Sequence, residues 1–249
     1  MEMIIRILVF FMIGVFAGSM SGLFGIGGGS IRIPLLNLAG LPLLSAYGIN
    51  LFVIPLSSLV GAYSHRKNIV YRIGPYMIIG GTLGSVIGAL LAGMIPTLVL
   101  AMIFVSITIL TVLAIYVEKI IPRIAGRFKQ KPWIILTGTF LLNVITGMRG
   151  GSGGSLFPPF LKAVRMDIHK AIATSLFVTI FTAAAAIVVY WNRGNILWLP
   201  AVFVASGSMI GARLGSGLSL RTKPVWLEVG LSVLVVFLAL LVVYRVIST

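Results

Sequence analysis

The sequence contains no cysteine and only four acidic residues in a chain of 249. The lack of cysteine excludes a secreted fold held together by disulfides. The scarcity of carboxylates leaves almost nothing for catalysis by paired acids. No cluster of histidine, cysteine and acidic residues suggests a metal site. We therefore expect neither a metal ion nor another cofactor.

Charged residues of either sign are also few. They make up 9% of the chain, whereas hydrophobic residues make up 59% and the mean hydropathy is +1.15. An average soluble domain is about one quarter charged, so this composition excludes a soluble globular protein. A transmembrane helix needs roughly 20 apolar residues. With short connections, the length predicts an all-α polytopic membrane protein with about eight transmembrane helices.

Polar or helix-breaking residues divide the sequence into apolar runs of suitable length. These runs cover residues 4–23, 44–64, 74–94, 96–117, 133–148, 170–191, 196–217 and 224–246. The longest polar insert lies between the fourth and fifth runs and is basic. We predict a first membrane repeat at 1–118, a basic cytoplasmic linker at 119–132 and a second membrane repeat at 133–249.

Lysine and arginine outnumber the acids by 19 to 4. Most of them lie between apolar runs, where anionic lipid headgroups and the positive-inside bias account for them. The expected partner is therefore the lipid bilayer and not nucleic acid. With eight crossings, the bias predicts a multi-pass protein of the cell membrane with both termini in the cytoplasm.

Two segments of the chain repeat each other at a shift of 147 − 22 = 125 residues. Residues 22–36 and 147–161 are identical at seven of fifteen positions, and residues 84–89 resemble 207–212 in the same order within each half. Two ordered matches at nearly one spacing indicate two homologous four-helix halves. Glycine also recurs at every fourth position in several runs, which indicates close helix packing within the chain, with a homodimer as the alternative.

The repeated segments contain two glycine-rich strings, at residues 25–30 and 150–155. So many glycines in succession disfavour an α-helix, at about 1 kcal/mol each relative to alanine. Within a bilayer, the freed backbone groups must face protein or a wet cavity. We therefore predict a broken or re-entrant segment in each half, with a short helix beginning at Ser30 or Ser155. The alternative counts these short segments as full crossings, which gives five per half and an inverted repeat. A helix N-terminus attracts anions, so these strings predict a substrate site, with a tight surface loop as the alternative.

Other polar residues of the same regions are candidate donors to an anion. Arg149 lies on the second string and is predicted to be the principal fixed charge. For Arg32, snorkelling to lipid headgroups is an equal alternative. Asn50 and Ser175 are related by the same shift of 125 and offer neutral donors. The candidate substrate-binding residues are Gly27, Gly28, Gly29, Ser30, Asn50, Arg149, Ser152, Gly153, Gly154, Ser155 and Ser175.

Two other functions are considered beside a carrier. Residues 150–153 fit the G-x-S-G pattern of rhomboid-type intramembrane serine proteases, for which Ser152 and His169 would be the catalytic pair. An anion channel is the other alternative, although unequal strings argue against a ring of identical donors. Asp167 is predicted to cap the helix at His169. Proton coupling is left open.

These strings resemble the TauE/SafE family of sulfite exporters and related anion permeases. The resemblance rests on residues 22–30 with 34–36, on 46–51, on 65–67 and on 84–93, and it covers nearly the whole chain. It implies a plasma-membrane carrier with two homologous halves for sulfite, thiosulfate, sulfonates or other small organic anions. The motif residues that match are Gly25, Gly27, Gly28, Gly29, Ser30 and Pro34, with Gly150, Gly153, Gly154, Ser155 and Pro159. Ser152 and Arg149 depart from the family pattern.

Overall fold

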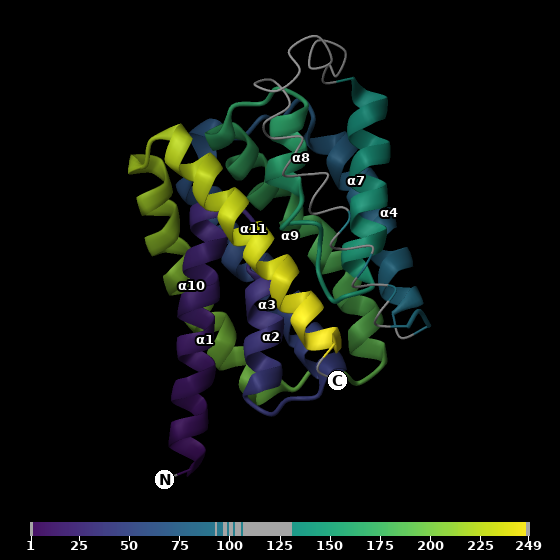
Figure 1. Cartoon of the computed structure of the whole chain (residues 1–249), viewed down its shortest axis with the longest axis vertical. Coiled ribbons are helices and arrows are strands. Elements are labelled where there is room, and N and C mark those ends of the chain that lie inside the picture. Colours follow the sequence, from purple (N-terminus) through teal and green to yellow (C-terminus); the bar gives the residue numbers. More distant parts are fainter. Residues whose placement is uncertain are drawn as a thin grey trace.

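The computed structural model describes residues 2–92, 94–96, 99, 102, 106 and 131–247, and all regular structure among them is helical. The all-α prediction is thus confirmed. Figure 1 shows the helices as one upright bundle, crossed on one face by the last helix. The elements are α1 (Glu2–Phe24), α2 (Gly29–Leu38), α3 (Leu43–Ser64), the 3-10 helix η1 (Arg66–Asn68), α4 (Gly74–Leu91), α7 (Pro132–Gly147), α8 (Phe157–Ala163), α9 (Ile168–Asn192), α10 (Trp198–Arg221) and α11 (Pro224–Ile247).

Five of the described helices, α1, α3, α4, α9 and α10, are long and apolar enough to cross a membrane. Shorter apolar helical stretches lie at Pro132–Gly147 and Pro224–Leu234. The predicted run at 96–117 falls almost entirely outside the described residues. The chain is therefore a multi-pass all-helical protein, whereas the count of eight spans stays a prediction.

Small residues bring two pairs of helices into backbone contact. Along α1, Gly14, Gly18 and Gly22 lie against the α10 backbone at Val204, Ser208 and Ala212. Along α4, the same spacing sets Gly80, Gly84 and Gly88 against the α7 backbone at Leu136, Phe140 and Val144. The glycines thus pack helices within one chain, as lipid supplies no hydrophobic drive for their association.

The order of these contacts gives the direction of each helix. Residue numbers rise together in α1 with α10 and in α4 with α7, so each pair is parallel. They also rise together in α3 with α10, since Gly48 meets Asn195 just before α10 and Gly61 meets Ser216 within it. Between α3 and α9 the order is reversed, since Tyr47 meets Tyr190 and Ser58 meets Thr179. Hence α1, α3 and α10 run one way and α9 runs the other.

Helices α4 and α7 run with α9, since Gly74 lies near Phe177 and Arg193 donates to the carbonyl of Ala89. Because α1 and α3 are parallel, the first string and α2 carry the chain back between them. Helix α8 does the same between α7 and α9. Figure 1 shows α2 near the lower end of the bundle, where α1 starts, and α8 near the upper end, where α7 starts.

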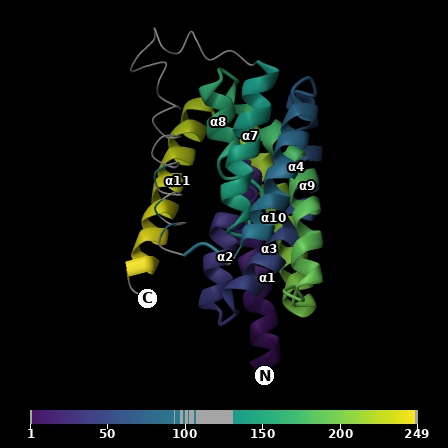
Figure 2. The same ribbon diagram turned by 90° about the vertical axis from the view of Figure 1, so that its right-hand side faces the viewer.

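The described helices begin and end at two opposite ends of the bundle. Helix α1 begins and α11 ends toward the lower part of the bundle, whereas α7 begins at the upper end (Figures 1 and 2). The linker predicted at 119–132 lies almost entirely outside the described residues, so its place on the cytoplasmic side with both termini stays a prediction.

Candidate functional site

The two glycine strings, defined as residues 25–30 and 150–155, meet inside the bundle. A Cβ added to Gly154 would lie 2.8 Å from the carbonyl oxygen of Ile26 and 3.0 Å from the backbone nitrogen of Gly27. A Cβ on Gly27 would lie 3.6 Å from the Cα of Gly154. The two backbones are therefore in direct contact, which a side chain at position 154 would prevent.

Each string is held by a side chain at an equivalent place in the other part of the chain. Ser175 Oγ donates to the carbonyl of Gly25 at 2.7 Å, and Asn50 Nδ2 donates to the carbonyl of Gly150 at 2.7 Å. Both acceptors and both donors are related by the shift of 125, since 150 − 25 = 175 − 50. Asn50 and Ser175, predicted as donors to substrate, thus donate to backbone carbonyls and fix the strings.

Arg32 is the residue that the predicted site omitted. It lies in the first turn of α2 and is fully buried. Its Nη1 donates to Asn50 Oδ1 and its Nη2 to Ser208 Oγ at 3.2 Å, while its Nε has no hydrogen-bond partner among the described residues. Helical side chains lean toward the N-terminus of their helix. A residue one turn into α2 therefore points back to the string. This spacing could have identified Arg32 as a site residue from the sequence.

No described carboxylate balances the charge of Arg32. Glu228 pairs with Lys162 at 2.8 Å. Asp167 caps α9 by accepting from the backbone nitrogens of His169 at 3.0 Å and Lys170 at 3.3 Å, as predicted. The side chains of Glu2 and Glu118 lie outside the described set. A buried charge without a counter-charge is costly, so this position favours an anion.

Further donors lie beside the Arg32 guanidinium. Gly28 caps α2 with a left-handed φ of 70°, and a Cβ there would lie 2.9 Å from Arg32 Nη2 and 3.3 Å from Ser21 Cβ. Ser21 Oγ is buried and has no hydrogen-bond partner within the described part of the chain. The N-terminus of α2, which carries positive partial charge, begins at the same place. Arg32, Ser21 and the start of α2 thus form one electropositive cluster.

The second string has an apolar ring at the position that matches Arg32. The equivalent of Arg32 is Phe157, since 32 + 125 = 157, and a Cβ on Gly153 would lie 2.7 Å from its ring and 2.7 Å from Asn143 Nδ2. Helix α8 begins at Phe157, two residues later than predicted, and has only seven residues. The predicted helix start at Ser155 is therefore corrected. In the first half, α2 begins at Gly29, one residue before the predicted Ser30.

Arg149, the predicted principal charge, lies just after α7 and is only partly buried. Its guanidinium interacts with the Tyr47 side chain of α3. Arg149 therefore has a polar partner in the protein and remains a secondary candidate beside Arg32.

Ser152 and His169 do not form a catalytic pair. The backbone carbonyl of Ser152 accepts from Thr182 Oγ1 at 3.2 Å, and Thr182 follows His169 by 182 − 169 = 13 residues on α9. At a rise of 1.5 Å per residue this is about 20 Å along the helix, far beyond hydrogen-bond reach. His169 is therefore too far from Ser152 to act as its general base, which argues against the protease alternative.

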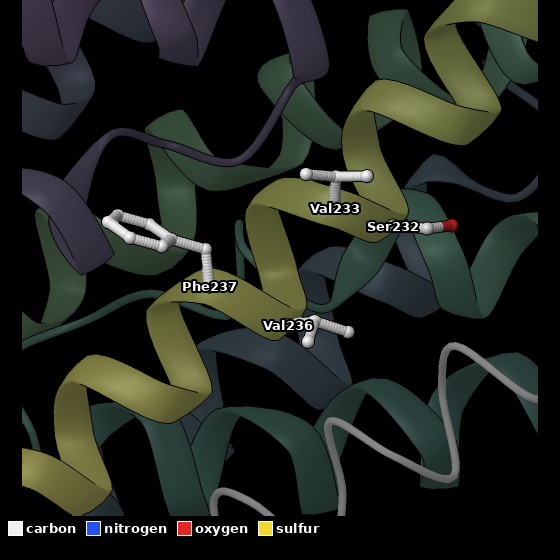
Figure 3. Close-up of a pocket in the computed structure, with 4 residues that line it drawn as sticks. All are labelled: Ser232, Val233, Val236 and Phe237. Carbon is white, nitrogen blue, oxygen red and sulfur yellow. The ribbon is translucent and has the colours of Figure 1, made fainter.

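A hollow on the outer surface of α11 is lined mainly by apolar side chains. Figure 3 shows Val233, Val236 and Phe237 around it, with Ser232 at its edge. The three apolar side chains are exposed, whereas Ser232 Oγ donates to the carbonyl of Glu228 at 2.8 Å. Such a surface suits lipid hydrocarbon.

These features define a multi-pass, all-helical membrane transporter. The chain belongs to the TauE/SafE family, matching the family described as Sulfite exporter TauE/SafE over residues 10–242. The resemblance inferred from the glycine strings is thus confirmed. The chain is 29% identical over 220 residues to the probable membrane transporter protein YdhB of Bacillus subtilis, covering 84% of this chain and 87% of that protein. It is 26% identical over 251 residues to the probable membrane transporter protein MJ0441 of Methanocaldococcus jannaschii, covering 93% of each. No solved structure matches it.

Proposed function

We propose that this protein carries small anions across the membrane, most specifically sulfur oxyanions and sulfonates, and binds them at the first glycine string. The observation that carries the proposal is the fully buried Arg32, whose Nε lacks a partner among the described residues. Membership of the family described as Sulfite exporter TauE/SafE supports the substrate class. A planar guanidinium offers parallel donors that fit two oxygens of a sulfite-like anion.

The anion contacts follow from the cluster around Arg32. Arg32 Nε supplies the charged donor, Ser21 Oγ a neutral one, and the first turn of α2, with Gly28, Gly29 and Ser30, supplies backbone dipoles. The second string, with Gly153, Gly154 and Ser155, forms the opposing wall because its backbone touches residues 26 and 27. Ser152 Oγ, buried and without a partner among the described atoms, is a further donor on that side.

We propose that the carrier has two homologous halves of inverted orientation. Helices α1, α3 and α4 correspond by the shift of about 125 to α7, α9 and α10, and each runs opposite to its counterpart. Transporters with such inverted repeats bind substrate at broken helices near the middle of the membrane and alternate by rocking of one part on another. The contact between the two strings is the natural place for this movement.

The test is uptake by proteoliposomes containing the purified full chain. Sulfite, thiosulfate and a small sulfonate are offered, with chloride and a neutral sulfoxide as comparison solutes. We expect uptake of one or more sulfur anions and its loss in Arg32→Gln, while Arg221→Gln, which removes a charge at the exposed end of α10, transports normally. Equal uptake of the neutral sulfoxide, or unchanged anion affinity in Arg32→Gln, contradicts the proposed site.

A further inference from the structure

The outer surface of the bundle carries a second arginine site, separate from the glycine strings. A hollow between α3 and α10 is lined by Leu59, Val60, Tyr63, Ser64, Arg66 and Arg213. Two of these six residues are cationic, and none is acidic. The two arginines come from different helices, so the hollow joins positive charge from both.

Arg213 is exposed within the body of α10. It precedes the last residue of the helix, Arg221, by 221 − 213 = 8 residues, which is about 12 Å of helix. Its neighbour Leu214 is 63% exposed, and Ile210 is 50% exposed, as expected of a surface that faces hydrocarbon. A guanidinium in such a place is costly unless it reaches a headgroup or an anion.

Arg66, the first residue of the 3-10 helix η1 that follows α3, lines the same hollow. Its guanidinium lies 4.6 Å from the centre of the Tyr63 ring, and its Nη1 donates to the Tyr63 carbonyl at 3.3 Å. A cation over an aromatic face is stabilised but keeps its remaining donors free to bind. Arg66 is thus held beside the hollow with its charge uncancelled by any described carboxylate.

We infer that this hollow binds the headgroup phosphate of an anionic phospholipid. Arg66 and Arg213 donate to the phosphate oxygens, and an acyl chain lies along Leu59 and Val60. The apolar wall distinguishes a lipid from a free phosphate ion, which gains nothing from Leu59. A phosphate drawn toward Arg213 also relieves the cost of its position. This site is independent of the proposed anion transport.

The experiment is native mass spectrometry of the full chain released from micelles with phosphatidylglycerol or phosphatidylcholine. We expect a retained phosphatidylglycerol adduct, with affinity about tenfold lower in Arg213→Gln and in Arg66→Gln. The matched controls are Arg221→Gln on α10 and Lys67→Gln beside Arg66, which remove the same charge at exposed positions outside the hollow.

Four outcomes overturn the inference. One is equal weakening in the controls, which indicates a diffuse charge effect. Another is equal retention of phosphatidylcholine, and a third is displacement of the lipid by inorganic phosphate, which indicates a simple ion site. The fourth is an unchanged adduct in both hollow variants. All four substitutions are at exposed positions, so folding of the variants is expected to be normal.

Discussion

The two glycine strings share one backbone plan but have different surroundings. Each is anchored through the carbonyl of its first glycine, Gly25 or Gly150, by a side chain at an equivalent position elsewhere in the chain. Beside the first string lies Arg32, and beside the second lies Phe157, at the matching position. The same frame therefore holds a charge on one side and a hydrocarbon ring on the other.

This difference shows that the contact between the strings and the binding charge depend on different residues, although the two strings repeat each other in sequence. The glycines and their anchors allow two backbones to touch in the bundle, and this need applies to both strings. Among the described residues, the fully buried arginine lies beside the first string, whereas Arg149 beside the second is only partly buried, so an anion is expected to bind asymmetrically. The strings determine the shape of the proposed site, and Arg32 supplies its positive charge.

The largest effect on the contact between the two strings is expected from Gly154→Ala. The added Cβ would meet the Ile26 carbonyl at 2.8 Å, and backbone cannot move aside as a side chain can. We expect the strings to separate, transport to be lost, and stability to fall by about 1–3 kcal/mol. Flux and thermal unfolding of the purified protein measure this. Gly217→Ala is the matched control, since a Cβ there meets nothing within 4 Å; equal damage by both changes would argue against the contact.

The next effect is expected at Arg32. Arg32→Gln should weaken anion affinity by about tenfold to a hundredfold, the value of one charge-assisted hydrogen bond. Stability should stay the same or rise, because a buried charge without a counter-ion is removed. Arg149→Gln should weaken affinity less, since the protein already supplies Tyr47 as its partner. Competition binding compares the variants, and a larger loss for Arg149→Gln reverses the assignment.

Asn50 and Ser175, the side chains that hold the two strings, are expected to differ in importance. Asn50 bonds both Arg32 and the Gly150 carbonyl, whereas the hydroxyl of Ser175 donates to the Gly25 carbonyl. Asn50→Ala should therefore cost about 1–3 kcal/mol of stability and also lower anion affinity, and Ser175→Ala about 0.5–1.5 kcal/mol. Denaturation curves measure the stabilities. Equal losses for the two variants, with anion affinity unaffected, would show that Asn50 has no special role beside the arginine.

A separate effect is the dependence of stability on pH through His65, near the first string. The pKa of His65 is lowered from 6.5 to about 4, mainly by burial; the Gly22 carbonyl opposes this shift and the nearby His169 adds to it. Between these values the unfolded chain binds a proton that the folded chain does not. Stability should therefore fall as pH decreases from about 6.5 to about 4, and level off below.

His65→Gln should reduce that slope in thermal unfolding measured across this range. Tyr190→Phe is the control from the equivalent position, since 65 + 125 = 190 and a phenol gains no proton there. A slope that survives in His65→Gln assigns the effect to another group.

The local pattern of the sequence carried much of this architecture. Apolar runs of helical length indicated a multi-pass bundle, and glycines at every fourth position indicated close packing, because both depend on neighbours in the chain. The spacing of 125 residues between the strings also identified Asn50 and Ser175 as equivalent positions from the sequence alone. The starts of the short helices were less certain, because a string of glycines has no side chain that marks a cap.

Tertiary structure alone decided the helix directions and the identity of the buried charge. Arg32 and Arg149 look alike in sequence, since each adjoins a glycine string. Arg32 is the fully buried one because its partners come from α3 and α10, 18 and 176 residues away along the chain. Such partners are brought together only when the helices pack, and burial, which sets the energy of a charge, exists only in the packed state.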